Sequence, residues 1–443
     1  MRRNLPIALL ALGLIWSSSV LADYDKGIAA IERKDYAAAL AEFTASAQEG
    51  DARAQAGLAR LYRDGLGVPQ DSAQALTWYR KAAQQGEPKA EIGLGWMSEH
   101  GMGGPLDAPA ALSWYRRAAE RGFVGGQVAL GRAFRIGIGT PIDYAQALSW
   151  YTKAANQDDA SAKVMIGSMY WDGKGVARDD VQALAWFRKA ADQNDPIGQY
   201  EVAQVYLAGR GVPRDDAEAV KWLRKAADQD DPPAEVELGR AYDQGRGVAH
   251  DAAEAIAWYR KAADQQDESA QLALAVHYYS GAGVSKDLNA ARLLMRSSAE
   301  HGDANVQTLL GSLFATSEDG NSPDYEQAAY WFGKAADQGN ANAQFGLGAV
   351  YLMMPFNGKG VADEKQMVVW SKKAIALFKK SAAQHNEGAQ CMLDAVFPDG
   401  VPAASDNSLP AMAEALKRAF IAQSGKCKRW GFSGDVKLFG VKP

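Results

Sequence analysis

Cysteine and histidine are scarce in this chain of 443 residues, which holds two cysteines and five histidines. Small domains that are stapled by several disulfides need a far higher cysteine content, so that class of protein is excluded. Helical zinc sites pair two histidines four residues apart. None of the five has such a neighbour: His100, His250, His277, His301 and His385. We therefore expect no metal site.

Neither sign of charge dominates, and long apolar runs are missing. The 48 Lys and Arg residues and the 53 Asp and Glu residues give a net charge of -5, which is too weak a field to favour nucleic acid as a partner. The apolar stretch 5–16 has 12 residues, whereas a helix that spans a membrane needs about 20. We expect no nucleic-acid partner and no stable membrane insertion.

That apolar stretch is typical of a cleaved secretory signal. It follows Arg2 and Arg3 and is followed by serines and by the small residues that end at Ala22. A lipoprotein signal would need cysteine at the next position, which is Asp23. We expect a signal peptide over 1–22 and a periplasmic or, alternatively, secreted protein, and an uncleaved anchor is the competing interpretation.

Catalytic motifs are missing as well. The sequence has no G-x-S-x-G elbow, no S-x-x-K pair, no H-E-x-x-H motif, no P-loop, and no G-x-G-x-x-G after a strand. Acidic pairs such as Asp179-Asp180 resemble acid/base dyads in isolation. However, aspartate recurs every 36 residues from Asp71 to Asp287, where the cap of a helix explains it. We predict that the protein is not an enzyme and needs no cofactor.

What the sequence has in abundance is a repeat with a period of 36 residues. A Gly-x-Gly pair recurs at this spacing from Gly65 to Gly283. Six tryptophans keep the same spacing: Trp78, Trp114, Trp150, Trp186, Trp222 and Trp258. A fixed period of this length indicates stacked supersecondary units.

One copy, residues 51–86, predicts a helical hairpin. Leu58 and Tyr62 lie on one face of a first helix because they are four residues apart. The glycine pair ends this helix, since glycine accepts the left-handed backbone. Asp71 caps a second helix, in which we expect Trp78 to fill the gap to the next hairpin. One hairpin cannot bury its own faces, so successive hairpins must stack.

The residues of the repeat carry a family resemblance. The pattern A-x-x-x-L-G-x-x-Y-x-x-G-x-G-V, followed by D-x-x-x-A-x-x-W-x-x-K-A-A-x-x-G, resembles the Sel1-like repeat, a relative of the tetratricopeptide repeat. It fits residues 162–192 at nearly every position, and nine copies lie between Asp51 and Asn386. The resemblance implies an all-α fold, a right-handed α-solenoid of stacked helical hairpins in a TPR-like superhelix, that serves as a scaffold or adaptor.

The points where the repeat begins and ends divide the sequence into four predicted segments. Residues 1–22 are the signal peptide, 23–50 an N-terminal capping hairpin, and 51–397 the repeat solenoid, whose last copy carries insertions. Residues 398–443 are a linker, a short helix and a basic tail. Contact of this tail with anionic envelope polymers is one interpretation, and simple solvation is the other.

The face that the repeat pattern leaves free is the predicted partner site. Positions equivalent to 56, 60 and 63 lie on the side of the first helix away from the core. They hold Trp, Tyr and Arg, the residue types that dominate binding hot spots. Packing between neighbouring helices is the alternative role for the aromatic ones. The predicted residues are Arg60, Trp96, Arg132, Arg135, Trp171, Tyr200, Arg240 and Tyr279.

Two functions remain open. The favoured one is a periplasmic scaffold that binds a protein or peptide on its concave face, in envelope regulation or polysaccharide export, as the resemblance implies. The alternative is a protein that binds or hydrolyses an envelope polymer or a β-lactam, as cysteine-rich Sel1-like proteins are thought to do. This chain departs from those relatives, because it lacks a cysteine pair in each repeat.

The two cysteines are predicted to form a disulfide, because an exported protein meets an oxidising compartment. A Cys391–Cys427 bridge would close a loop of 427 minus 391, or 36 residues. It would fasten the basic tail to the last hairpin and contribute ~3 to 4 kcal/mol in the chain-entropy model. Two unpaired thiols are the alternative.

Overall fold

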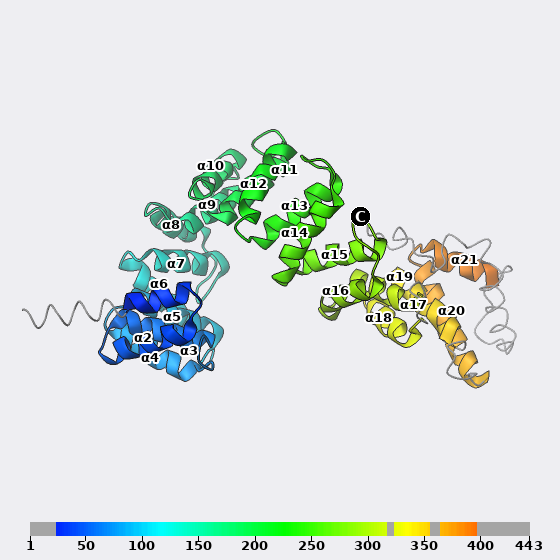
Figure 1. Cartoon of the computed structure of the whole chain (residues 1–443), viewed down its shortest axis with the longest axis horizontal. Coiled ribbons are helices and arrows are strands. Elements are labelled where there is room, and N and C mark those ends of the chain that lie inside the picture. The colour runs from blue at the N-terminus through cyan, green and yellow to red at the C-terminus, as the bar shows by residue number, and fades with distance from the viewer. Residues whose placement is uncertain (1–23, 317–322, 355–363, 397–443) are drawn as a thin grey trace, which may run out of the picture. The chain divides into compact units, whose positions relative to one another are not determined.

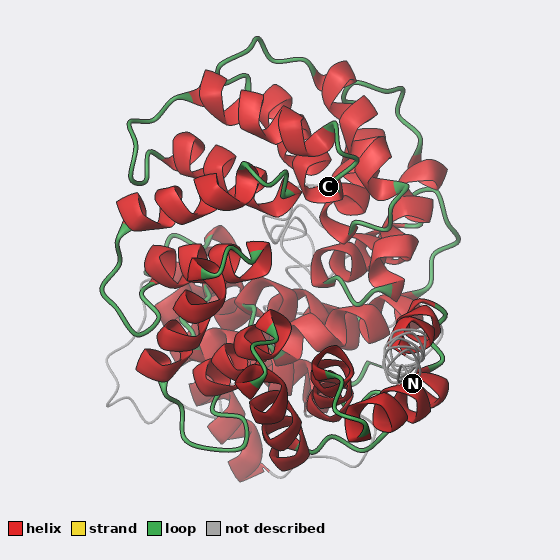
Figure 2. Cartoon of the chain, turned by 90° about the vertical axis from the view of Figure 1, so that its left-hand side faces the viewer, coloured by secondary structure: helices red, strands yellow, loops and turns green. Residues whose placement is uncertain are grey.

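The computed structural model describes residues 24–316, 323–354 and 364–396. Every regular element in these ranges is a helix, and loops and turns join the helices (Figure 2). The segments 1–22 and 398–443 lie outside the described residues. The chain divides into two compact units, residues 1–229 and 230–443, which we call the first and the second unit and describe separately.

The first unit contains a helical stretch over residues 24–32, then α2 (Tyr36–Gln48), and then five hairpins (Figure 1). We call the two helices of each hairpin A and B. The A helices are α3 (Ala52–Asp64), α5 (Pro88–His100), α7 (Val124–Ile136), α9 (Ala160–Asp172) and α11 (Pro196–Ala208). The B helices are α4 (Ser72–Gln84), α6 (Ala108–Glu120), α8 (Tyr144–Ala155), α10 (Asp180–Ala191) and α12 (Asp216–Ala227).

The second unit repeats the same plan and closes with α21 (Glu387–Val396). Its A helices are α13 (Pro232–Gln244), α15 (Glu268–Ser280), α17 (Ala304–Ala315) and α19 (Ala341–Met353). Its B helices are α14 (Ala252–Asp264), α16 (Leu288–Glu300), α18 (Tyr325–Asp337) and α20 (Glu364–Ala382). Within each unit every A helix contacts its own B helix, and successive hairpins stack. The predicted α-solenoid of stacked helical hairpins is confirmed.

Local chemistry sets the limits of the helices. Gly65 and Gly67 end the first A helix with φ of +69° and +70°, and a Cβ on Gly67 would lie 2.6 Å from the Tyr36 carbonyl oxygen. The Asp71 carboxylate accepts hydrogen bonds of 2.9 Å from the backbone N–H groups of Ala73 and Gln74. The same aspartate caps the B helix in later repeats, Asp179 and Asp215 among them, which confirms the capping interpretation of the acidic pairs.

Trp78 packs against two neighbouring clusters of the core, as predicted, but its ring is not the centre of either cluster. The ring of Trp78 and those of its repeat equivalents are half-buried, and each lies under a cationic side chain three residues on. The Lys153 ammonium, for example, lies 3.5 Å from the ring centroid of Trp150. The following residue forms the core instead, and none of these is more than 3% exposed: Tyr79, Tyr115, Tyr151, Phe187, Leu223 and Tyr259. Consecutive residues lie about 100° apart around a helix, so only one of the two can face the interior.

Candidate partner-binding surface

The structure divides the eight predicted partner residues between the two units. Arg240 on α13 and Tyr279 on α15 belong to the second unit. The other six lie on the A helices of the first unit: Arg60, Trp96, Arg132, Arg135, Trp171 and Tyr200. Helix α5 contacts both α3 and α7, and α9 contacts α11, so side chains at equivalent positions follow one another from repeat to repeat. We call these six residues the A-helix row.

The beginning of the row is exposed on α3 and half-buried on α5. Arg60 is exposed, and its Nε lies 3.5 Å from the Asp64 carboxylate. The Trp96 ring stacks on His100 with centroids 4.2 Å apart. The ring has a second contact, with Arg63 of the preceding A helix, whose guanidinium carbon lies 4.7 Å from the Trp96 centroid. Trp96 therefore contacts the preceding repeat through Arg63 and is half-buried.

The middle of the row contains a hydrogen-bonded triad that crosses two repeats. The Tyr115 hydroxyl donates to Glu99 Oε2 over 2.7 Å, and Arg132 Nη2 donates to the same oxygen. Burial acts to raise the pKa of Glu99, but the hydrogen bonds from Arg132 and Tyr115 outweigh it and hold that pKa below its usual value. Glu99 therefore stays ionised, and this ion pair fixes the direction of the Arg132 side chain.

The end of the row is ordered in a similar way. Arg135 lies beside Tyr151, whose pKa is raised by burial and lowered in part by that guanidinium. The guanidinium carbon of Arg210 lies 3.5 Å from the Trp171 ring centroid, and Arg210 Nη2 donates to the Trp171 carbonyl oxygen over 3.0 Å. Tyr200, on α11, is half-buried. Trp171 is therefore held by Arg210 of the next repeat.

The two predicted residues of the second unit have comparable surroundings. Arg240 is exposed, and its Nη1 lies 2.5 Å from the Glu237 carboxylate. Tyr279 is half-buried, with the Lys286 ammonium 5.8 Å from its ring centroid. Arg240 stands at the repeat position of Arg60, five repeats further on. Neither residue belongs to the A-helix row of the first unit.

A cavity that the sequence did not predict lies at the start of the first unit. It has a volume of about 310 Å³, and residues of the 24–32 helical stretch, α3 and α5 line it together with the rings of Phe43 and Tyr79. These rings lie close against glycines. A Cβ on Gly57 would lie 3.0 Å from Phe43, and one on Gly93 would lie 2.5 Å from Tyr79. Later repeats have side chains at this position: Ala129, Met165, Glu201 and Glu237.

The described part of the chain offers little for other kinds of site. Within it, no three His, Cys, Asp or Glu side chains are grouped so that they could hold a metal ion. No helix in the same ranges combines the length and the apolarity needed to cross a bilayer. Cys391 lies on α21, and Cys427 lies outside the described residues, so the disulfide stays a prediction.

Known proteins resemble this chain in sequence and in structure. The protective antigen of uropathogenic Escherichia coli, which displays an SLR fold, is 32% identical, with 85% of this chain and 79% of that chain covered and a TM-score of 0.57. A Sel1 repeat protein from Oxalobacter formigenes is 31% identical, with 54% and 96% covered and a TM-score of 0.47. No curated protein matches.

The Sel1 repeat matches the chain nine times in succession. The matched residues are 52–87, 88–123, 125–159, 160–195, 196–231, 232–267, 268–303, 304–340 and 341–386. They include every hairpin described above. The fold of this repeat is typically non-catalytic and binds protein partners. The protein therefore belongs to the Sel1 repeat family.

Proposed function

We propose that this protein is a periplasmic scaffold that binds a protein or peptide partner on the A-helix row of its first unit. The observation that carries the proposal is the row itself. Arg and Trp side chains that the repeat pattern does not require follow one another on successive A helices. These residue types dominate the energetics of protein interfaces.

The contacts within the row suit it for binding. Trp96 is held between Arg63 and His100, and Arg132 is held by Glu99. A side chain that is already ordered loses less conformational entropy when a partner docks. The remaining exposed part of each ring and guanidinium can then contact the partner with little rearrangement.

A triple substitution of the row tests the proposal. Arg132→Ala, Arg135→Ala and Trp171→Ala together are expected to abolish capture of the partner, measured by crosslinking in the periplasm, purification and mass spectrometry. The structure also predicts a modest loss of stability, about 1 kcal/mol, because Glu99 loses its ion pair but keeps the hydrogen bond from Tyr115. Thermal unfolding followed by circular dichroism measures this loss.

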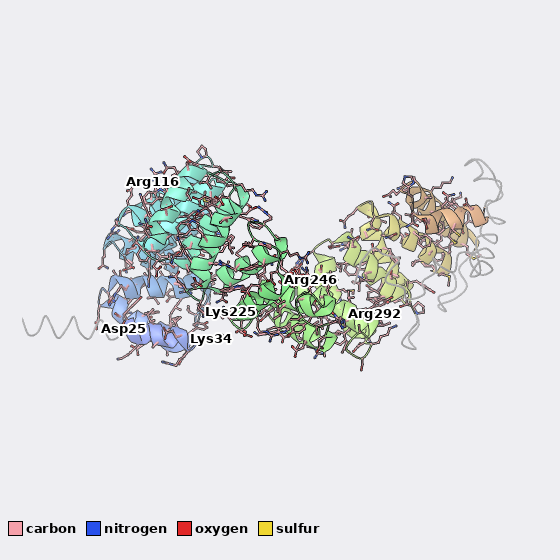
Figure 3. The ribbon with its side chains drawn as sticks, turned by 90° about the horizontal axis from the view of Figure 1, so that it is seen from above. Asp25, Lys34, Arg116, Lys225, Arg246 and Arg292 are labelled. Atoms are coloured by element: carbon pink, nitrogen blue, oxygen red, sulfur yellow. The ribbon has the colours of Figure 1, made fainter. Side chains whose placement is uncertain are left out.

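The B helices provide a matched control. Arg80→Ala, Arg116→Ala and Trp150→Ala remove the same three chemical groups from α4, α6 and α8. Arg80 and Arg116 are exposed, and Trp150 is half-buried (Arg116 is labelled in Figure 3). This variant should keep the partner. If both triple variants lose the partner, or if neither does, the A-helix row is not the binding surface.

Export and the disulfide are tested by one measurement, the intact mass of the protein purified from the periplasm. The charged start, the apolar stretch 5–16 and Ala22 support cleavage before Asp23. We expect a chain that begins at Asp23 and is two hydrogen atoms lighter than its reduced form. Retention of residues 1–22 would contradict cleavage, and two thiols that alkylate without reductant would contradict the bridge.

A further inference from the structure

The cavity at the start of the first unit carries a positive charge that the chain as a whole does not share. Among the described residues, four cations and no carboxylate line it: Arg53, Arg60, Arg63 and Lys89. Asp51 lies 3.5 Å from Arg53, and Asp64 lies 2.6 Å from Arg63 and 3.5 Å from Arg60. Four cations minus these two carboxylates leave an excess of two positive charges, on a chain whose net charge is -5.

The interior of the same cavity is apolar. Ile28, Ile31 and Ile92 line it together with the rings of Phe43 and Tyr79. Burial raises the pKa of Tyr79 to about 12, so this ring is neutral at physiological pH. The volume of about 310 Å³ is at the lower end of the range for ligand pockets, about 300 to 1,000 Å³. The cavity therefore has room for one or two side chains rather than for a folded domain.

We propose that this cavity binds a segment of the partner in which a large apolar side chain is flanked by carboxylates. The proposal rests on the function proposed above and gives the chemistry of the partner. The apolar side chain would lie against Phe43 and Ile92. The carboxylates would meet Arg60 and Lys89, which are exposed, whereas Arg53 and Arg63 are half-buried. A guanidinium can hold a carboxylate through two parallel hydrogen bonds, and a basic segment would be repelled.

The proposal is tested with a fluorescein-labelled synthetic peptide that has a Leu-Phe pair between glutamates. Fluorescence anisotropy with the mature chain, residues 23–443, should show saturable binding that weakens as salt is added. The same peptide with lysines in place of the glutamates should not bind below about 1 mM. Arg60→Glu should weaken binding of the glutamate peptide by at least about tenfold. Arg60 is exposed, so circular dichroism should show an unchanged fold.

Arg240→Glu is the matched control. Arg240 stands at the same repeat position as Arg60, and it is also exposed and paired with a carboxylate on its own helix, but it lies outside the cavity. This variant should bind the glutamate peptide within about twofold of the unchanged protein. The proposal is overturned if the glutamate peptide does not bind, if both peptides bind equally, or if Arg240→Glu costs as much affinity as Arg60→Glu.

These outcomes are separate from those of the proposed function. If the chain captures its partner through the A-helix row but does not bind the glutamate peptide, the cavity proposal alone is overturned. A chain that binds the peptide through Arg60, but captures the partner equally well after the triple substitution of Arg132, Arg135 and Trp171, would overturn the proposed function alone.

Discussion

Replacing Phe187 by alanine is expected to destabilise the protein by about 3 to 5 kcal/mol. Its ring is 1% exposed and packs in one cluster with Val164 from α9, Val202 and Val205 from α11, and residues of its own helix. The substitution would leave a cavity between two hairpins. Because a solenoid is stabilised only by contacts between neighbours, we expect α9 and α11 to loosen with α10. Urea unfolding gives the free-energy change, and hydrogen exchange locates it.

Two controls sharpen this prediction. Phe187→Leu should cost only about 1 kcal/mol. The next repeat already has leucine at the equivalent position, Leu223, which is 1% exposed. Trp186→Ala should cost about 1 to 2 kcal/mol, because that ring is half-buried beneath the Lys189 ammonium. If Trp186→Ala proved more damaging than Phe187→Ala, the assignment of Phe187 as the core residue would be wrong.

The adjacent pair Trp186 and Phe187 also shows where sequence reasoning stops. The hairpins, the turns and the caps could be predicted because each depends on residues that are close in the sequence. Asp71 bonds to N–H groups two and three residues on, and Gly65 needs only its own backbone freedom. The choice between two neighbouring aromatic residues depends on the hairpin that packs against them. The regular spacing of tryptophan marks the repeat but does not identify its core.

The candidate site was predictable in part for the same reason. The position of a residue around the A helix, counted from the core residues, correctly predicted that Arg60 and Arg240 are exposed. It could not give the contact of Trp96 with Arg63, because Arg63 lies on the preceding A helix. Gly57 and Gly93 line the cavity and leave room for the rings of Phe43 and Tyr79, and the 24–32 stretch that also lines it does not follow the repeat. Glycine at this repeat position in the first two repeats was the one feature of the sequence that could have indicated the cavity.

The triad of Tyr115, Glu99 and Arg132 has a counterpart in the second unit. The Tyr259 hydroxyl donates to Asp243 Oδ2 over 3.3 Å, and His277 Nε2 lies 2.9 Å from the same oxygen. In both units an acidic group on an A helix accepts a hydrogen bond from the core tyrosine of its own repeat and one from a cation of the next repeat. Arginine keeps its charge at any ordinary pH, whereas histidine does not.

The surroundings of His277 favour its charged form. Its side chain is buried, and its Nδ1 lies 2.8 Å from the Ala282 carbonyl oxygen. Both ring nitrogens face oxygen acceptors, so both must carry hydrogen to be satisfied. The hydrogen bond to Asp243 raises the pKa of His277 above its usual value and outweighs the opposing effect of burial. Two further charged groups lie close enough to act on Tyr259 of this cluster: Arg240 lowers its pKa and Glu237 raises it.

We therefore expect stability to fall as pH rises through the pKa of folded His277. The unfolded chain has the ordinary histidine pKa of about 6.5, which lies below the folded value. The stabilisation is then fully present below the unfolded pKa and is lost above the folded one. The loss begins near the unfolded pKa and is complete above the folded one, and thermal unfolding at a series of pH values measures it.

His277→Met separates this histidine from the other titrating groups of the chain. Two earlier repeats have methionine at the position equivalent to His277, and both residues, Met97 and Met169, are almost fully buried. The variant should therefore fold. The exposed ion pair of His301 and Glu268, 2.6 Å apart, is present in both proteins and cancels in the comparison. The variant should be less stable than the unchanged protein near pH 6, and the difference should shrink toward pH 8. A difference that stays constant with pH would show that His277 contributes packing rather than charge.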